Sequence, residues 1–438
     1  VWRQLPRPLF PLALFPIGRA QAALLAALLM LASADARAQA KFDAKQFIVV
    51  GEGLAAGMAD FALRDAYQTR SFPAQLAKQM NVGFPQPLME APGLAGDMPG
   101  FQTLPPRLPG VQQGSVRTKF PPDLFVFNLS VPGMRLADSL NRRAAPPVIH
   151  QRDPQQTLLN MILGYPTLIA GRNKPLWTQT EYAVAMNPTL VLVELGYFEV
   201  LEAATKDDPR LLPDVNTFRT NFTTLLTRLK ASSPQMIVLT IPDPFDTAFF
   251  TPVPSATKYV GAPFDELNKI FRLRADDLLT PNGLILVGGL ILADNLGNIR
   301  SPLFPGLGSF FPGTVVSAAT QRAVQTRLQA LNVEITNAAK AANANVYDLQ
   351  ALFARVKSQG VSLTSKTLTS EYLGGFYSLD GYYPGLIGHG LIANEILQLI
   401  NTTYKTSYAA VDLNGIAESD PVLRFTPALA KPPVEVVQ

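Results

Sequence analysis

The sequence predicts an α/β protein built on a three-layer, doubly wound parallel sheet. Short apolar, β-branched runs alternate along the chain with segments of helical periodicity, an order that places helices on both faces of a parallel sheet. The chain has 438 residues, of which 47% are hydrophobic and 16% charged, so it can bury a full core. We expect one domain over residues 41–420, interrupted by long loop insertions.

The strands are predicted from buried apolar runs and the helices from apolar stripes. The predicted strands are Gln46–Gly51, Leu124–Asn128, Thr189–Glu194, Met236–Thr240 and Asn345–Asp348. The clearest predicted helices are Phe218–Ala231, Gln321–Ala342 and Gly388–Tyr404. Each helix carries apolar residues at spacings of three or four, as a helix packed on a sheet requires.

Three long segments of weak periodicity separate these elements, at residues 81–122, 142–186 and 246–319. The first is rich in proline and glycine and is expected to form a flap over the carboxyl edge of the sheet. The third contains an apolar run, Gly283–Ala293, that looks like a hairpin. Loops of this length are typical of lids or interaction surfaces, although ordinary surface covering is an equal alternative. Residues 421–438 are expected to form a frayed tail.

The first forty residues resemble an export signal. Arg3, Arg7 and Arg19 precede an apolar stretch, Ala22–Ala32, that is short for a membrane span, and small-x-small cleavage sites follow within 36–40. We expect a periplasmic, cell-surface or extracellular protein with no transmembrane span in the mature chain. An uncleaved N-terminal anchor is the alternative.

Charge and composition exclude several classes of partner. Outside residues 1–40 the chain carries 33 basic and 32 acidic residues, which is no footprint for nucleic acid. There is no cysteine and there are two histidines, so no cluster has the spacing of a metal site. Glycine pairs occur as turn signals and not as a phosphate-binding loop, so no cofactor is expected.

The turn after the first strand carries the main functional signal. Gly51-Glu52-Gly53-Leu54 has the frame of the turn that presents a serine nucleophile beside helix amides, but glycine stands where the serine belongs. Gly53 has no hydroxyl and cannot attack a substrate.

Several separated segments resemble one family, the SGNH (GDSL-type) esterases and lipases, over roughly residues 45–411. The matching segments are Phe47–Phe61, Ser71–Ala77, Asn128–Gly133, Leu195–Glu199, Asn332–Asp348, Leu379–Pro384 and Gly388–Ala393. The resemblance implies a flavodoxin-like arrangement of the sheet. Fold likeness by itself does not establish the chemistry.

The resemblance also assigns positions in the family's catalytic site. Gly53 stands at the serine, Phe198 at the oxyanion-hole asparagine and Tyr383 at the histidine base, while Gly133 and Asp380 match the family. Tyrosine, with a pKa of about 10, is a poor base at neutral pH. Loss of one oxyanion donor costs roughly 10²–10³ in rate, and loss of a nucleophile or base about 10⁶. The family mechanism is therefore not expected to operate.

Few residues are available as substitutes. His389, at the start of the last predicted helix, is expected to pack structurally, and His150 is expected on the surface. Ser130 lies three residues before Gly133 but has no adjacent base in the sequence.

Carboxylates and aromatic residues converge on the same edge of the predicted sheet. Glu52, Tyr197, Glu199 and Tyr382 are candidates for lining a binding cleft beside Asp380. Such a cleft would suit a sugar, or its carboxylates would form a general-acid pair. The alternative is that these groups are remnants of an esterase site, bonded to nearby amides.

These observations favour an exported pseudoenzyme with a binding, structural or assembly role and an unknown ligand or protein partner. The alternative is an active ester hydrolase, acting on acyl or acetylated-glycan substrates through rearranged residues. A homo-oligomeric assembly that uses the insertions is a further alternative.

Overall fold

Four parallel strands form the central sheet in the order β1-β2-β3-β7. They are β1 (Phe47–Gly51), β2 (Leu190–Glu194), β3 (Gln235–Leu239) and β7 (Asn345–Tyr347). Residues 127–131 extend the sheet on the free side of β1: the amide of Val49 donates to the carbonyl of Phe127 (2.9 Å), and that of Leu129 donates to the carbonyl of Val49 (3.0 Å). In chain order the strands run 2-1-3-4-5, the flavodoxin-like arrangement. The predicted fold class is confirmed.

The computed structural model describes residues 42–95, 98–101, 125–233, 235–295, 313–364, 366–420 and 423. The predicted signal at 1–40 lies outside these residues, as do much of the flap at 81–122 and all of the tail at 421–438 except Leu423. In the described part of the chain, no helix is both long and apolar enough to cross a membrane.

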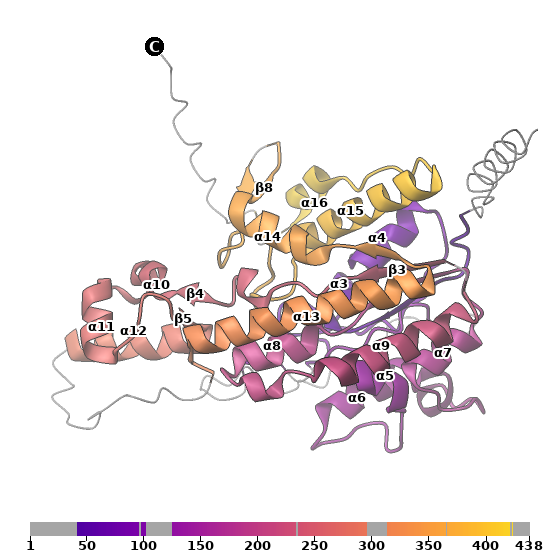
Figure 1. Ribbon diagram of the computed structural model, residues 1–438, viewed down its shortest axis with the longest axis horizontal. Helices are drawn as coiled ribbons and strands as arrows, with labels where there is room; N and C mark the ends of the chain where they lie inside the picture. The colour runs from indigo at the N-terminus through magenta and orange to yellow at the C-terminus, as the bar shows by residue number, and fades with distance from the viewer. Residues whose placement is uncertain are drawn as a thin grey trace, which may run out of the picture. The chain divides into compact units, whose positions relative to one another are not determined.

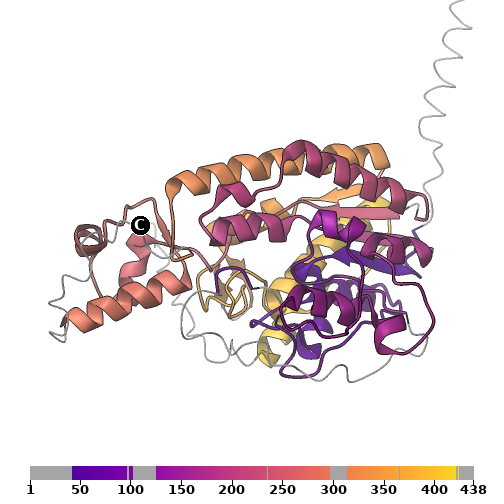
Figure 2. The same cartoon turned by 90° about the horizontal axis from the view of Figure 1, so that it is seen from below.

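Helices cover both faces of the sheet, as Figures 1 and 2 show. On one face α4 (Phe72–Gln79) packs against α15 (Leu386–Tyr404), with α14 (Leu349–Gln359) beside them. On the other face the long helix α13 (Ala318–Ala342) packs against α9 (Val215–Lys230), and α5 (Leu136–Asn141) and α7 (Gln179–Ala185) also contact α9. All five residues of β1, β2 and β3 are buried, because each strand lies between two helical layers.

The apolar stripes that predicted the helices form the core. In α9 the buried positions include Phe222, Leu225 and Leu229, and in α13 they include Leu328 and Ile335. Spacings of three and four place these side chains on one face of each helix, which explains why the sequence located both elements.

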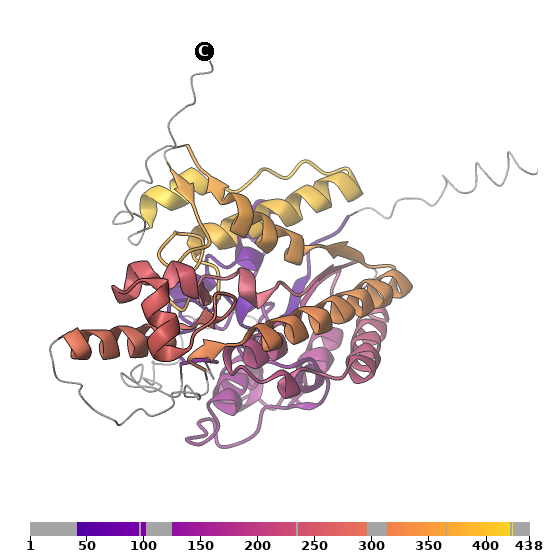
Figure 3. The same cartoon turned by 60° about the vertical axis from the view of Figure 1, so that its left-hand side comes forward.

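The described parts of the insertion, residues 251–295 and 313–316, form a lobe of their own (Figure 3). Helices α10 (Val253–Val260), α11 (Phe264–Phe271) and α12 (Pro281–Asn295) pack together beside a small antiparallel sheet of β4 (Thr251–Pro252), β5 (Leu278–Leu279) and β6 (Val315–Val316). The hairpin predicted at Gly283–Ala293 is wrong, because this run is helix α12. Its residues Val287 and Ile291, four apart, are buried in the lobe core, so packing on α10 overrides the glycine pair Gly288-Gly289.

Shorter elements complete the chain. They are α2 (Gly53–Ala56), α3 (Asp65–Gln68), α6 (Pro154–Ile162), a π-helical turn (Tyr165–Ile169), α8 (Tyr197–Thr205), 3-10 turns at Pro209–Leu211 and Pro244–Asp246, β8 (Val361–Ser362), β9 (Thr367–Leu368) and α16 (Leu413–Ser419). The predicted insertion at 142–186 therefore contains α6, the π-helical turn and α7.

Candidate functional site

The turn after β1 is capped by its own glutamate. Glu52 precedes the four-residue helix α2, and its side chain accepts a hydrogen bond from the amide of Leu54 (2.9 Å). The helix ends at Gly57, whose φ of +79° suits glycine. Glu52 is completely buried, so the turn presents no side chain to solvent at this position.

Tyr383 occupies the space that a side chain at position 53 would need. A Cβ atom built on Gly53 would lie 2.4 Å from the hydroxyl oxygen of Tyr383 and 2.6 Å from its Cζ. The tyrosine is buried, and its hydroxyl donates to Oε2 of Glu52 at 3.1 Å. Tyr383, at the position of the family's histidine, therefore leaves room only for glycine at position 53, the position of the family's serine.

The carboxylate of Glu52 lies among the backbone amides of the turn after β1. Burial raises the pKa of Glu52 to about 6, while hydrogen bonds from the amides of Leu54 and Gly53 lower it. The Tyr383 hydroxyl and the amide of Gly133 lower this pKa further. Donors of this kind stabilise a developing oxyanion in an esterase, but here a resident carboxylate already accepts from them.

Asp380 shapes the loop that carries Tyr383. Its Oδ1 accepts from the amides of Tyr382 (3.1 Å) and Tyr383 (2.8 Å), and its Oδ2 accepts from the hydroxyl of Ser378 (2.6 Å). Burial raises the pKa of Asp380 to about 7. The matched aspartate thus holds a turn in place and contacts no histidine in the described structure.

Asp60 anchors the same loop from the other side. Its Oδ1 accepts from the amide of Leu379 (2.9 Å), and its own amide donates to Oγ of Ser378 (3.2 Å). The loop that carries Tyr383 is therefore held by a chain of hydrogen bonds that begins outside the loop, at Asp60.

Phe198 fills the position that the resemblance assigns to an amide donor. It lies in the first turn of α8, which follows Gly196 at φ +107°, and the guanidinium of Arg135 stacks 5.4 Å from its ring centroid. Its neighbour Tyr197 donates from its hydroxyl to the carbonyl of Tyr382 (3.1 Å), which joins α8 to the Asp380 loop. Both aromatic side chains are buried.

The four cleft candidates are brought together, but not around open space. Exposed fractions are 0% for Glu52, Tyr197 and Tyr382 and 5% for Glu199. These side chains pack against one another at this point, where the Tyr382 and Tyr383 rings meet edge to face at 4.9 Å.

Glu199 and Glu194 add further buried acid to the site. Oε1 of Glu199 accepts from the amide of Leu136 (2.8 Å), while its buried Oε2 has no hydrogen-bond partner among the described residues. Burial raises the pKa of Glu199 to about 7. Oε2 of Glu194 accepts from the amides of Glu52 (3.1 Å) and Ala55 (3.2 Å). Burial, followed by repulsion from Glu52, holds the pKa of Glu194 well above its usual value.

Sequence reasoning did not select Glu194 or Gln155. Glu194 is the last residue of β2 and pairs in register with Gly51, so its position at the carboxyl end of a strand was an available signal. Nothing in the sequence around Gln155 indicates that its side chain lies at the site. A Cβ atom built on Gly133, where φ is +77°, would lie 2.5 Å from Oε1 of Gln155, so this side chain covers the glycine.

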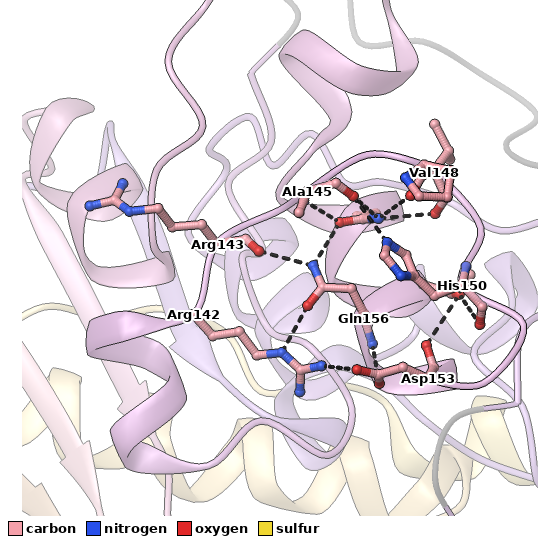
Figure 4. Close-up of polar contacts among 10 residues, drawn as sticks. Arg142, Arg143, Ala145, Val148, His150, Asp153 and Gln156 are labelled. Atoms are coloured by element: carbon pink, nitrogen blue, oxygen red, sulfur yellow. Dashed lines mark hydrogen bonds and ion pairs between the residues drawn. The ribbon is translucent and has the colours of Figure 1, made fainter.

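A polar network fixes the helix that carries Gln155 (Figure 4). Arg142 donates to Oε1 of Gln156 (2.9 Å) and to Oδ2 of Asp153 (2.6 Å), and Gln156 donates to Oδ1 of Asn160 (2.9 Å). Asn160 in turn donates to three carbonyls of the preceding loop, including that of Val148 (3.1 Å). The start of α6 is thereby held over the Gly133 loop.

The residues considered as substitutes lie apart from any catalytic arrangement. His389 is fully buried, accepts from the amide of Phe72 at Nδ1 (3.3 Å), and has its pKa lowered to about 3 by burial. Ser130 is buried, and its Oγ has no hydrogen-bond partner among the described residues. His150 contacts the carbonyl of Ala145 (3.1 Å) within the network of Figure 4. In the described chain, no cluster of three or more histidine, aspartate or glutamate residues can hold a metal ion.

No protein-family model matches this sequence, and no curated protein is significantly similar to it. Among solved structures, the chain is similar to an alpha/beta hydrolase from the metagenome of Lake Arreo, Spain, at 13% identity over 82% of this chain and 96% of that one, with a TM-score of 0.34. It is similar to a lipase/acylhydrolase from Enterococcus faecalis at 13% identity over 83% and 98%, with a TM-score of 0.33. An acetylxylan esterase from Geobacillus stearothermophilus is matched at 11% identity over 85% and 100%, with a TM-score of 0.36. At such scores the assignment of the fold rests on the strand order and register of the sheet.

Proposed function

We propose that this protein is an exported pseudoenzyme with an SGNH-hydrolase-like fold, whose former catalytic site has become part of the core. One observation carries the proposal: the Tyr383 side chain fills the space of a side chain at position 53 and its hydroxyl donates to Glu52, whose carboxylate also accepts from the amide of Leu54. A substrate carbonyl would need this same volume and these same donors.

The buried acids support the same proposal. A general base must lie within reach of its substrate, and Glu52, Glu199 and Asp380 are at most 5% exposed. Their oxygens accept mainly from backbone amides, as expected for remnants that now stabilise turns. The role that remains is binding or assembly through surfaces away from Gly53.

An active ester hydrolase that uses rearranged residues finds less support. Ser130 is the serine considered as a substitute nucleophile, yet it is 2% exposed and its Oγ has no hydrogen-bond partner among the described residues. His389 is held neutral in an apolar environment beside Phe72.

The test is hydrolysis of p-nitrophenyl acetate and labelling by a fluorophosphonate probe, each compared with Ser130→Ala. We expect rates equal to those of buffer and no labelled residue in either protein. Turnover or labelling that disappears in Ser130→Ala would overturn the proposal. Turnover that persists would point to another active site and would overturn it equally.

Export is tested separately. We expect the protein recovered from outside the cytoplasm of a bacterial host to begin after Ala38 or Ala40, as N-terminal sequencing would show. A cytoplasmic protein that retains residues 1–40 would contradict export and leave the site proposal unaffected.

A further inference from the structure

A groove of about 430 Å³ runs along α15, between this helix and the extended segment 405–411. It begins with Asn394, eight residues into a helix that starts at Leu386. At a rise of about 1.5 Å per residue, the groove lies roughly 12–24 Å along the helix from its first turn. It is therefore separate from Gly53.

Two asparagines hold the groove's outer wall in place. Asn401 donates to the carbonyl of Tyr408 (2.9 Å) and accepts from its amide (2.8 Å). Asn394 makes the same pair of bonds with Val411, at 3.1 Å and 2.6 Å. The asparagines are seven residues apart and lie on one face of the helix, so the segment is fixed at two points. A wall ordered without a ligand lowers the entropic cost of binding.

The one acidic residue among the described residues that line the groove, Glu395, is paired with an arginine outside it. Glu395 lies within it and accepts from Arg355 (2.5 Å) and from the hydroxyl of Tyr347 (3.3 Å). None of the described residues that line the groove is basic, so a free anion has no counter-charge among them. Leu397 and Ala410 are its only aliphatic lining residues, which is too little for an apolar ligand.

The remaining lining groups suit hydroxyls. Gln398 is exposed between the two asparagines, and its carboxamide offers both a donor and an acceptor. Thr402 adds a hydroxyl one turn further along the same face. The ring of Tyr408 supplies an apolar face with a polar tip.

We propose that this groove binds a neutral, hydroxyl-rich ligand, namely a short oligosaccharide, with one sugar ring against Tyr408 and its hydroxyls bonded by Gln398 and Thr402. The volume falls within the range of small-ligand sites. Binding in this groove does not require open space around Gly53. The proposed sugar site is therefore tested independently of the pseudoenzyme proposal.

Isothermal titration calorimetry of the full-length mature protein with cellotetraose, maltotetraose and chitotetraose tests the site. We expect at least one of the three to bind, and Gln398→Ala and Tyr408→Ala each to weaken it by about tenfold or more. The matched control is Gln359→Ala, another exposed helical glutamine, on α14, which is expected to leave the affinity unchanged.

Two results would overturn the assignment. One is that none of the three sugars binds at about 10 mM, a weak-affinity limit. The other is that binding is unaffected by Gln398→Ala, which removes an exposed side chain and cannot act by unfolding the protein. Binding of inorganic phosphate or decanoate in place of the sugars would overturn the ligand class.

Discussion

At the scale of single residues, the pair Gly53 and Tyr383 decides what this site can do. The tyrosine ring lies where a Cβ atom at position 53 would be, and its hydroxyl satisfies a buried carboxylate. The sequence alone showed that the serine and histidine were missing. It did not show that one replacement fills the space left by the other, because that contact joins residues 330 positions apart.

Restoring the serine alone is expected to destabilise the protein. Gly53→Ser places Cβ 2.4 Å from the Tyr383 hydroxyl, and overpacking of this kind costs about 1–3 kcal/mol. Urea unfolding measures the loss. Gly289→Ser is the control, because nothing lies within 4 Å of its Cβ position, and its effect should stay within about 0.5 kcal/mol.

The double variant Gly53→Ser/Tyr383→Ala separates a clash from a general intolerance at position 53. If the clash is the cause, the cost of Gly53→Ser should largely vanish once Tyr383 is alanine, which gives a coupling energy of about 1 kcal/mol or more. Equal costs in both backgrounds would contradict the contact.

At the scale of elements, Asp380 holds the shape of the loop that carries Tyr383. Its carboxylate accepts from two amides of its own loop and one hydroxyl, and thereby places Tyr383 against Glu52. A residue that matches the family pattern can thus persist for stability alone.

Asp380→Ala is expected to lower the free energy of unfolding by about 3 kcal/mol, because two buried amides lose their acceptor. Asp412→Ala is the control: it caps the exposed start of α16 through the amide of Gly415 and should cost about 1 kcal/mol. Urea denaturation followed by circular dichroism measures both. Equal losses would mean that Asp380 does no more than an ordinary cap.

Elements with strong periodicity were predicted well, and those with mixed signals were not. Strands β1 and β2 are buried on both faces, so their sequences are continuous apolar runs. Helices α9 and α13 are buried on one face, so their sequences carry a single apolar stripe. The sequence does not identify helix α12, because this segment is apolar on nearly every side and contains Gly288-Gly289. Neither its periodicity nor its residue propensities distinguish a helix from a hairpin. Its partner α10, which supplies the packing, was not identifiable beforehand.

The sequence places Glu52, Tyr197, Glu199 and Tyr382 at one edge of the sheet, and the structure buries all four. Tyr197 donates to the carbonyl of Tyr382, and the hydroxyl of Tyr383 beside it donates to Glu52. Whether aromatic rings line a cleft or fill it depends on side-chain packing, which no sequence pattern specifies. For the same reason Gln155, whose side chain covers Gly133, went unnoticed.

At the scale of the whole molecule, buried carboxyl groups make stability depend on pH. Burial raises the pKa of Glu52 to about 6 and those of Glu199 and Asp380 to about 7, above their unfolded values. The stability they contribute is complete below about pH 4 and is lost as the pH rises through 6 and 7. His389 acts in the opposite direction: burial lowers its pKa to about 3, so its contribution is lost as the pH falls below about 6.5. The combined effect of the three carboxyl groups on the pH dependence of stability is larger than the opposite effect of His389.

We therefore expect the free energy of unfolding to be larger at pH 5.5 than at pH 8, by at least about 2 kcal/mol. Denaturant titrations at both values measure the difference. Glu199→Gln keeps an acceptor for the amide of Leu136 but cannot ionise, so it should reduce the difference substantially. A protein that is more stable at pH 8 than at pH 5.5 would contradict this assignment of the acids.

The mutual fit of glycine and tyrosine also constrains how such a lineage could change. A first step back toward serine meets the phenol ring, and a first step away from the tyrosine empties a packed space and removes a donor from Glu52. Each of these single steps is therefore expected to lower the stability of the protein. If the chain descends from an esterase, the contact between positions 53 and 383 would oppose a return to serine before any catalytic activity was regained.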